Sequence, residues 1–136
     1  MKPRDLTVAD LMTTALITVT PDDAITEAHE EMELGVVRHL PVVDERGHLV
    51  GVVSERDVSR ALASRRAHTV ADIMVRDMIT TTPETPAHSA ARTLVDRQIG
   101  SLLVVDAAGK LVGVVTQTDY VELARRALLS LPLERD

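Results

Sequence analysis

The chain has 136 residues, of which 45% are hydrophobic and 26% are charged, a balance typical of a soluble globular protein. This length allows one compact domain or two half-sized units that share a core. The formal net charge is −6, and the Arg residues are scattered among acidic ones, which argues against binding to nucleic acid. The chain has no cysteine, which excludes disulfides, thiolate metal sites and cysteine nucleophiles.

The first ten residues contain no apolar stretch of the kind that marks a secretory signal. The longest apolar runs, such as Leu49 to Val53, are far too short to cross a bilayer. These features predict a cytoplasmic protein without a membrane partner. Tyr120 is the only aromatic residue, so a flat ligand would be held by aliphatic side chains and backbone instead of between aromatic rings.

An internal repeat organises most of the sequence. Val8-Ala9-Asp10-Leu11-Met12 recurs as Val70-Ala71-Asp72-Ile73-Met74, an offset of 62 residues that holds without a gap to the end of the repeat. About twenty of some fifty-five paired positions are identical. The repeat predicts two copies of one structural unit, at 8–62 and 70–124, with a lead-in at 1–7 and the end of the last helix and a tail at 125–136.

In chain order, the first copy begins with a short helical turn around Asp10 and a brief extended segment near Thr18. A helix follows, with apolar residues at helical spacing on one face. Two β-branched runs, at 40–43 and 49–53, are joined by a turn in which Gly47 supplies the positive φ that a tight hairpin needs. Each copy closes with a helix, from about 54 to 64 and from about 116 to 129.

Thr85-Pro86 predicts the start of the first long helix in the second copy, with Thr85 as N-cap and Pro86 at the first helical position. The offset gives Asp23 the same capping role in the first copy. The order is thus strand, helix, strand, strand, helix, and the Val-rich strands need cover on both faces. We expect an α/β (α+β) fold in which two β-α-β-β-α repeats pack sheet to sheet with pseudo-two-fold symmetry.

The residues most typical of a binding site lie where each second hairpin strand runs into a helix, at Gly51 to Asp57 and Gly113 to Asp119. One interpretation is a capping box, in which Ser54 or Thr116 caps the helix and the Asp three residues later caps back. The other is a ligand site, because a helix N-terminus offers free N–H groups and partial positive charge to a phosphate. The motif alone does not separate the two.

Together these residues resemble a pair of cystathionine-β-synthase-type (CBS) domains. The resemblance is carried by Leu40-Pro41-Val42-Val43-Asp44, by the Gly51-Val52-Val53-Ser54-x-x-Asp57 motif and by their counterparts 62 residues later, and it covers about nine-tenths of the chain. It implies two clefts that bind adenosine derivatives such as AMP, ADP, ATP or S-adenosylmethionine as regulatory ligands, with no catalytic cofactor. It also implies a homodimer.

Within that resemblance, the Asp of each motif holds the ribose, the Ser or Thr contacts ribose or phosphate, and the adenine lies against the first strand and the segment entering the second. Carried over residue by residue, it groups Asp57 and Ser54 with Thr18, and Asp119 and Thr116 with Thr80. The full set of implied nucleotide-binding residues is Thr18, Arg38, His39, Leu40, Pro41, Ser54, Arg56, Asp57, Thr80, Ser101, Leu102, Thr116 and Asp119.

The two copies differ in charge at this site. Arg38-His39 stands where the second copy has Gly100-Ser101, and Arg56 is matched by Thr118. Because an Arg fork is well suited to phosphate, we hypothesise that the cleft with Asp57 takes a phosphorylated nucleotide more tightly than the cleft with Asp119. The alternative for the two Arg residues is a solvated surface pair.

The five histidines share no metal-ligand spacing, and no Ser or Thr has a recognisable base partner. We therefore predict neither a metal site nor an enzyme. The leading hypothesis is a regulatory module that binds an adenosine ligand and signals to an effector protein that the sequence does not name. The alternative is a structural or oligomerisation module whose clefts stay empty.

Overall fold

The computed structural model describes residues 2–66 and 68–131. A short 3-10 turn, Pro3–Asp5, leads into two sets of elements that obey the 62-residue offset. The first set is α1 (Val8–Leu11), α2 (Ile25–Gly35), β1 (His39–Val43), β2 (Leu49–Ser54) and α3 (Glu55–Ser64). The second set is α4 (Val70–Ile73), β3 (Thr80–Thr81), α5 (Ala87–Arg97), β4 (Ser101–Val105), β5 (Leu111–Thr116) and α6 (Gln117–Ser130). Of the predicted tail, residues 132–136 lie outside the described part.

Each repeat contains an antiparallel hairpin in the same register. His39 pairs with Ser54 across β1 and β2, and Ser101 pairs with Thr116 across β4 and β5. The expected leading strand is β3 in the second repeat, parallel to β4, whereas in the first repeat it shrinks to a single parallel bridge between Val19 and Val42. The predicted β-α-β-β-α order is therefore confirmed, with a shorter first strand in one copy.

Glycine makes both hairpin turns possible, as the sequence predicts. Gly47 has φ 86° and Gly109 has φ 83°, values that a residue with a Cβ adopts only at a cost. The Asp44 carboxylate closes the first turn by accepting the backbone N–H groups of Arg46 and His48, each at 2.9 Å. Burial is low here, yet the bond from the His48 N–H holds the pKa of Asp44 below its ordinary value.

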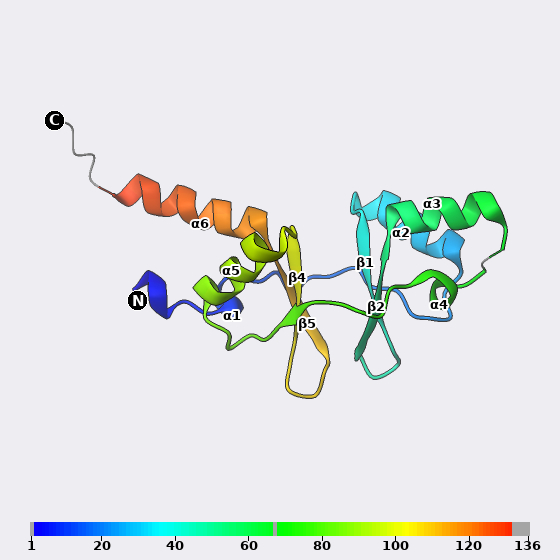
Figure 1. Ribbon diagram of the computed structural model, residues 1–136, viewed down its shortest axis with the longest axis horizontal. Helices are drawn as coiled ribbons and strands as arrows, with labels where there is room; N and C mark the ends of the chain where they lie inside the picture. The colour runs from blue at the N-terminus through cyan, green and yellow to red at the C-terminus, as the bar shows by residue number, and fades with distance from the viewer. Residues whose placement is uncertain (1, 67, 132–136) are drawn as a thin grey trace.

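The two hairpins lie side by side in the middle of the molecule, and the long helices lie on the outside (Figure 1). At one end the two turns join, because the Leu49 N–H donates to the Gly109 carbonyl at 3.1 Å and the Leu111 N–H donates to the Gly47 carbonyl at 3.0 Å. These reciprocal bonds relate equivalent residues of the two copies. The expected sheet-to-sheet packing with pseudo-two-fold symmetry is confirmed.

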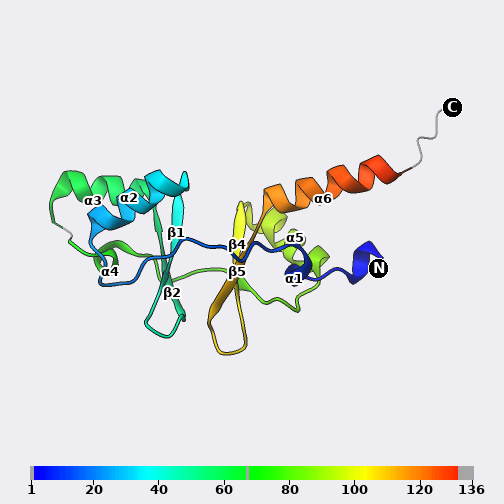
Figure 2. The ribbon, with the colours of Figure 1, turned by 180° about the vertical axis from the view of Figure 1, so that it is seen from behind.

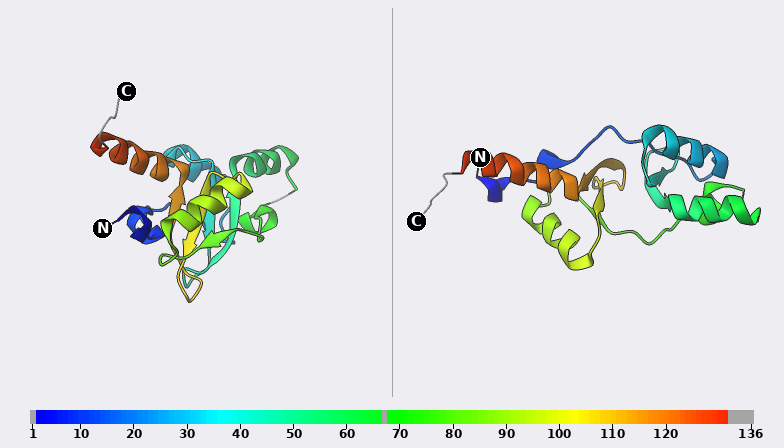
Figure 3. Two further views of the ribbon diagram at one scale, coloured as in Figure 1. Left: turned by 60° about the vertical axis from the view of Figure 1, so that its left-hand side comes forward. Right: turned by 90° about the horizontal axis from the view of Figure 1, so that it is seen from above.

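The first turn of helix in each repeat packs on the other repeat. Figures 1 and 2 show α1 beside α5 and α4 beneath α3. The chain makes backbone bridges as it crosses: Val75 pairs with Val52 of β2, with N–H···O distances of 2.9 and 3.0 Å, and Thr13 pairs with Val114 of β5 at 2.9 and 3.0 Å. Seen from above, the two crossing segments run on opposite sides of the molecule (Figure 3).

This exchange completes both hydrophobic cores. Val70 is fully buried in the core of the first repeat, together with Leu40, Val42 and Val53. Val8 is fully buried in the core of the second repeat. Burial of a valine side chain contributes about 1.5–3 kcal/mol, so each repeat depends on a residue that the other supplies.

The predicted caps of α2 and α5 are wrong by one residue. Ala24 is the N-cap of α2 and Pro86 is the N-cap of α5, and neither offers a side-chain cap. Asp23 instead accepts the Thr20 N–H at 2.8 Å, in the turn before the helix. The first N–H of each helix donates to a backbone carbonyl of the exchanged segment, His68 at 3.2 Å for α2 and Leu6 at 2.8 Å for α5, so no side-chain cap is needed there.

Candidate functional site

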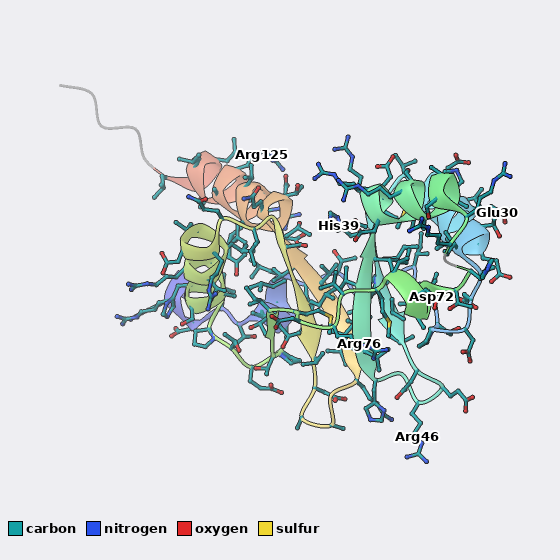
Figure 4. The ribbon with its side chains drawn as sticks, turned by 45° about the vertical axis from the view of Figure 1, so that its right-hand side comes forward. Glu30, His39, Arg46, Asp72, Arg76 and Arg125 are labelled. Atoms are coloured by element: carbon teal, nitrogen blue, oxygen red, sulfur yellow. The ribbon has the colours of Figure 1, made fainter. Side chains whose placement is uncertain are left out.

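A cleft of about 670 Å³ lies at the end of the first repeat's sheet where α3 begins. The pairing of His39 with Ser54 brings the start of β1 to the end of β2, and the Arg38 carbonyl accepts the Glu55 N–H at 2.8 Å. Figure 4 shows His39 at this end of the sheet and Arg46 at the opposite end, on the hairpin turn. The lining residues are Arg38, His39, Ser54, Glu55, Arg56, Asp57, Ser59 and Arg60.

Ser54 caps α3 and so fixes the geometry of the cleft. Its backbone is extended, and its hydroxyl accepts the Asp57 N–H at 3.2 Å. The free N–H groups of the first helical turn therefore open on the cleft, with the partial positive charge of the helix N-terminus. The carboxylate of Asp57 has no hydrogen-bond or ion-pair partner among residues 2–66 and 68–131, so it is available to accept hydroxyl groups from a ligand.

The equivalent acid of the second repeat is already engaged. The Asp119 carboxylate accepts the Thr116 N–H at 2.8 Å and the Thr116 hydroxyl at 3.1 Å, and Thr116 in turn accepts the Asp119 N–H at 3.3 Å. The capping box expected in both copies is thus complete only in the second. Structure separates what the shared motif leaves open: Asp119 serves its own helix, whereas Asp57 faces the cleft.

The cleft carries an excess of positive charge. Arg38, Arg56 and Arg60 stand against Glu55 and Asp57. Only Arg38 approaches an acid in the described residues, at 4.0 Å from Glu55, with 86% of its side chain exposed. Arg56 and Arg60 are one turn apart on α3, where like charges repel each other. An anion between them would relieve that repulsion.

Five of the thirteen predicted site residues meet in this cleft: Arg38, His39, Ser54, Arg56 and Asp57. The structure places two others of the first repeat elsewhere, since Leu40 and Pro41 are buried and do not line it. In the second repeat, Thr116 and Asp119 form the capping box, Ser101 is exposed opposite Thr116, Leu102 is buried in the core, and Thr80 is exposed on β3.

Thr18 does not join Asp57. Val19 pairs with β1, so Thr18 lies on the sheet edge away from β2, which carries Ser54. The segment that runs along β2 is the one that begins at Val75, and five residues later it reaches Thr80. Because the crossing segments exchange partners, the chain leads Thr80 away from the Asp57 side and Thr18 away from the β5 side. The grouping of Thr18 with Asp57 is corrected by this topology.

The sequence prediction missed three residues of the lining, Glu55, Ser59 and Arg60. Arg60 follows Arg56 by four residues, the spacing that places two side chains on one helical face. That spacing, together with the Glu122 that the offset aligns with Arg60, is the signal in the sequence that points to it. A smaller hollow of about 350 Å³, lined by Asp57, Arg60, Ala61, Ser64 and Ile73, adjoins the cleft and shares its Asp57 and Arg60.

The second repeat has the opposite charge at the matching positions. Glu122 takes the place of Arg60 and accepts the Arg125 guanidinium at 2.6 Å and that of Arg126 at 3.4 Å. The bond from Arg125 holds the pKa of Glu122 below its ordinary value, so the carboxylate stays ionised. Next to it, the Tyr120 hydroxyl donates to the Ala87 carbonyl at 2.7 Å, and burial raises the pKa of Tyr120.

Over the described ranges, no group of three or more His, Cys, Asp or Glu side chains could hold a metal ion. No helix in those same ranges is long and apolar enough to cross a membrane. The chemistry that the site offers is therefore that of hydrogen bonding and charge: one uncommitted carboxylate, a helix N-terminus and three guanidinium groups.

The chain belongs to the CBS domain family, which matches residues 8–64 and 70–126. CBSX2, a CBS-pair protein of Arabidopsis thaliana, was solved in complex with AMP; it is 32% identical, with a TM-score of 0.81 over 90% of this chain and 98% of that chain. The CBS domain pair of protein MJ0100, solved with 5′-methylthioadenosine and S-adenosylmethionine, is 32% identical, with a TM-score of 0.76 over 89% and 97% of the two chains.

Longer proteins also carry this pair. Homoserine O-acetyltransferase of Methanococcoides burtonii is 36% identical over 116 residues, which are 85% of this chain and 24% of that protein. The chain thus spans about a quarter of the length of this relative. CBS domain pairs are generally regulatory and not catalytic, and the likeness to such an enzyme is confined to this part.

Proposed function

We propose that this protein is a regulatory module that binds an adenosine nucleotide in the cleft of the first repeat and signals its presence to a partner protein. The observation that carries the proposal is the uncommitted carboxylate of Asp57, one turn into a helix whose N-terminus faces three guanidinium groups. A carboxylate in such a position accepts both hydroxyls of a ribose, and the N-terminus with its Arg residues holds phosphate.

Two solved relatives support the choice of ligand. CBSX2 was solved with AMP, and the MJ0100 pair was solved with methylthioadenosine and S-adenosylmethionine. All three ligands share the adenosine group, and they differ in charge at the 5′ end. The positive excess around Asp57 favours the phosphorylated member of this set for the first cleft.

The signal would pass through the arrangement of the two repeats. A ligand changes a conformational equilibrium only by binding one arrangement more tightly than another. The N-terminus of α3 contributes to the cleft, and α3 also packs against α4, which belongs to the second repeat in sequence. Nucleotide binding at α3 therefore acts on a segment that both repeats share.

We also propose a homodimer as the form that meets the partner. Large apolar side chains are exposed near the C-terminal ends of helices: Leu34 at 81%, Val36 at 90% and Val95 at 74%. Association of two chains would cover such side chains. Light scattering coupled to size-exclusion chromatography should give twice the mass of one chain, and a single-chain mass at micromolar concentration would refute this.

Calorimetric titration of AMP and ATP into the wild-type protein and two Asp variants tests the ligand proposal. Asp57→Ala should lose most of its nucleotide affinity, because the ribose loses its acceptor. Asp119→Ala should keep that affinity but unfold more easily, by about 1 kcal/mol, because it loses a helix cap. Equal loss of affinity in both variants would contradict the assignment to the first cleft.

A thermal-shift panel separates this proposal from a purely structural module. Nucleotide at a hundred times its dissociation constant stabilises the folded state by about 2.7 kcal/mol. A rise in Tm with AMP, ADP or ATP that disappears in Asp57→Ala supports regulation by nucleotide. No shift with these nucleotides or with S-adenosylmethionine would leave the clefts without a ligand and favour the structural role.

A further inference from the structure

We infer that Arg60 binds the phosphate groups of the ligand and that Glu122, at the same position of the second repeat, excludes phosphate from the second cleft. The inference rests on the proposed function and adds the feature that decides which adenosine derivative each half accepts. One residue position, repeated 62 residues apart with opposite charge, would restrict phosphorylated nucleotides to one site per chain.

The position of Arg60 comes from the helix. Arg56, Ser59 and Arg60 all line the cleft, as expected for residues three and four apart on one face of α3. Arg60 also lines the adjoining hollow with Asp57, so the guanidinium stands where a ligand on Asp57 extends beyond its ribose. A guanidinium presents planar paired donors that match two phosphate oxygens at once.

The empty cleft places like charges together without compensation. Arg56 and Arg60 are fully solvent-facing residues of one helical turn, and neither has an acidic partner within 4.0 Å in the part of the chain that the structure describes. Elsewhere on the surface, Arg92, Arg125 and Arg126 each pair with an acid on their own helix. The absence of such a pair at Arg56 and Arg60 points to an anion from outside the chain.

The second repeat lacks every one of these cations. The positions that match Arg38, Arg56 and Arg60 hold Gly100, Thr118 and Glu122. Asp119 is committed to its capping box, and Glu122 adds a second carboxylate one turn further along α6. A 5′-phosphate placed there would meet negative charge and no guanidinium of the matching set, so its binding is unfavourable.

The test uses the full chain and substitutes Arg60→Glu, which gives the first repeat the residue of the second. Arg46→Glu is the control, since it changes net charge equally but lies on the hairpin turn at the far end of the sheet (Figure 4). That end is roughly 17 Å away along β2 at about 3.3 Å per residue, beyond the screening length of about 8 Å at physiological salt. AMP, ADP and adenosine are titrated into each protein by calorimetry.

We expect wild-type protein and Arg46→Glu to bind AMP more tightly than adenosine, at one nucleotide per chain. Arg60→Glu should bind AMP about tenfold or more weakly, the loss expected when a charge-assisted hydrogen bond is replaced by repulsion, with adenosine affinity changed less than about twofold. Arg60→Gln should fall between the two for AMP, and all variants should share the wild-type melting temperature without ligand because position 60 is exposed.

Three results would overturn the inference. They are equal weakening of AMP in Arg60→Glu and Arg46→Glu, equal affinity of the wild type for AMP and adenosine, and two equivalent AMP sites per chain. Each of these leaves the proposed function standing, because the wild type still binds an adenosine derivative. Failure of the wild-type protein to bind AMP, ADP and adenosine would instead refute the proposed function itself.

Discussion

Met74 lies directly against Gly51, although the two residues belong to different repeats. A Cβ added at Gly51 would stand 2.9 Å from the Met74 Sδ and 3.1 Å from the Val75 carbonyl oxygen. Gly113 faces Met12 in the same way, at 2.8 Å from its Sδ and 3.0 Å from the Thr13 carbonyl oxygen. The strand glycine of each motif thus permits the exchanged segment to approach the hairpin closely.

Gly51→Ala should therefore destabilise the protein. The methionine side chain can move, but the Val75 carbonyl is held by its bridge to Val52, so the added Cβ overpacks the contact at a cost of about 1–3 kcal/mol. Urea denaturation measures the loss. Gly100→Ala is the matched control, because a Cβ there meets nothing within 4 Å, and equal stability of the two variants would refute the packing argument.

Val70→Ala should weaken the first repeat although Val70 lies in the sequence of the second. Removing two buried carbons costs roughly 2 kcal/mol from transfer and cavity effects together. Hydrogen exchange should accelerate in α2, β1 and β2 more than in β4 and β5. Val75→Ala, in the same crossing segment but 49% exposed, should have a much smaller effect. Faster exchange confined to β4 and β5 would contradict the exchange of segments.

Val36→Gly should stabilise the protein. Val36 ends α2 in the left-handed conformation, at φ 52° and ψ 46°, which a β-branched residue adopts at a cost of roughly 1–2 kcal/mol. Its side chain is 90% exposed, so glycine relieves this strain with little loss of packing. Thermal melting should show a higher Tm, with a smaller gain for Gln98→Gly at φ 55°. A lower Tm for Val36→Gly would disprove the prediction.

Acid should destabilise the fold partly through Asp72. Its carboxylate accepts the N–H groups of His68 and Thr69, both at 3.0 Å, and the bond from His68 is the main reason that its pKa lies below the ordinary value. A group with a lowered pKa stabilises the folded state above its unfolded pKa, and this contribution is lost as the pH falls from about 4 through the folded value.

The measurement is Tm against pH for the wild type and Asp72→Asn. The variant should melt at a lower temperature at pH 7, because the amide accepts these bonds less strongly. Its Tm should fall less steeply between about pH 5 and pH 3, because one titrating carboxylate has been removed. Parallel curves for the two proteins over this range would show that Asp72 does not contribute.

Much of the fold could be predicted from the repeat. The 62-residue offset places every element of one copy on the other, and the turn at Gly47 follows from its need for positive φ. The partner of each first helical turn could not be predicted. Val8 and Val70 occupy equivalent places in nearly identical segments, so the sequence pattern is equally satisfied by packing within a repeat or across the pair.

The same limit applies to the site. Arg38, His39, Ser54, Arg56 and Asp57 are close in the chain or joined by hairpin register, and the structure does bring them together. Thr18 depends on which edge of the sheet its segment follows, which only the crossing decides. The different states of Asp57 and Asp119 depend on side-chain geometry within identical motifs, which residue spacing does not contain.

The exchanged segments also bear on how such a protein could arise. Because Val8 completes one core and Val70 the other, one repeat on a separate chain could make these contacts only with a second copy. Two single-repeat chains would then assemble as a swapped dimer whose stability depends on concentration. Gene duplication that joins the copies through residues 65–69 removes that dependence and frees each half to diverge, which is how two clefts of common origin can come to carry opposite charge.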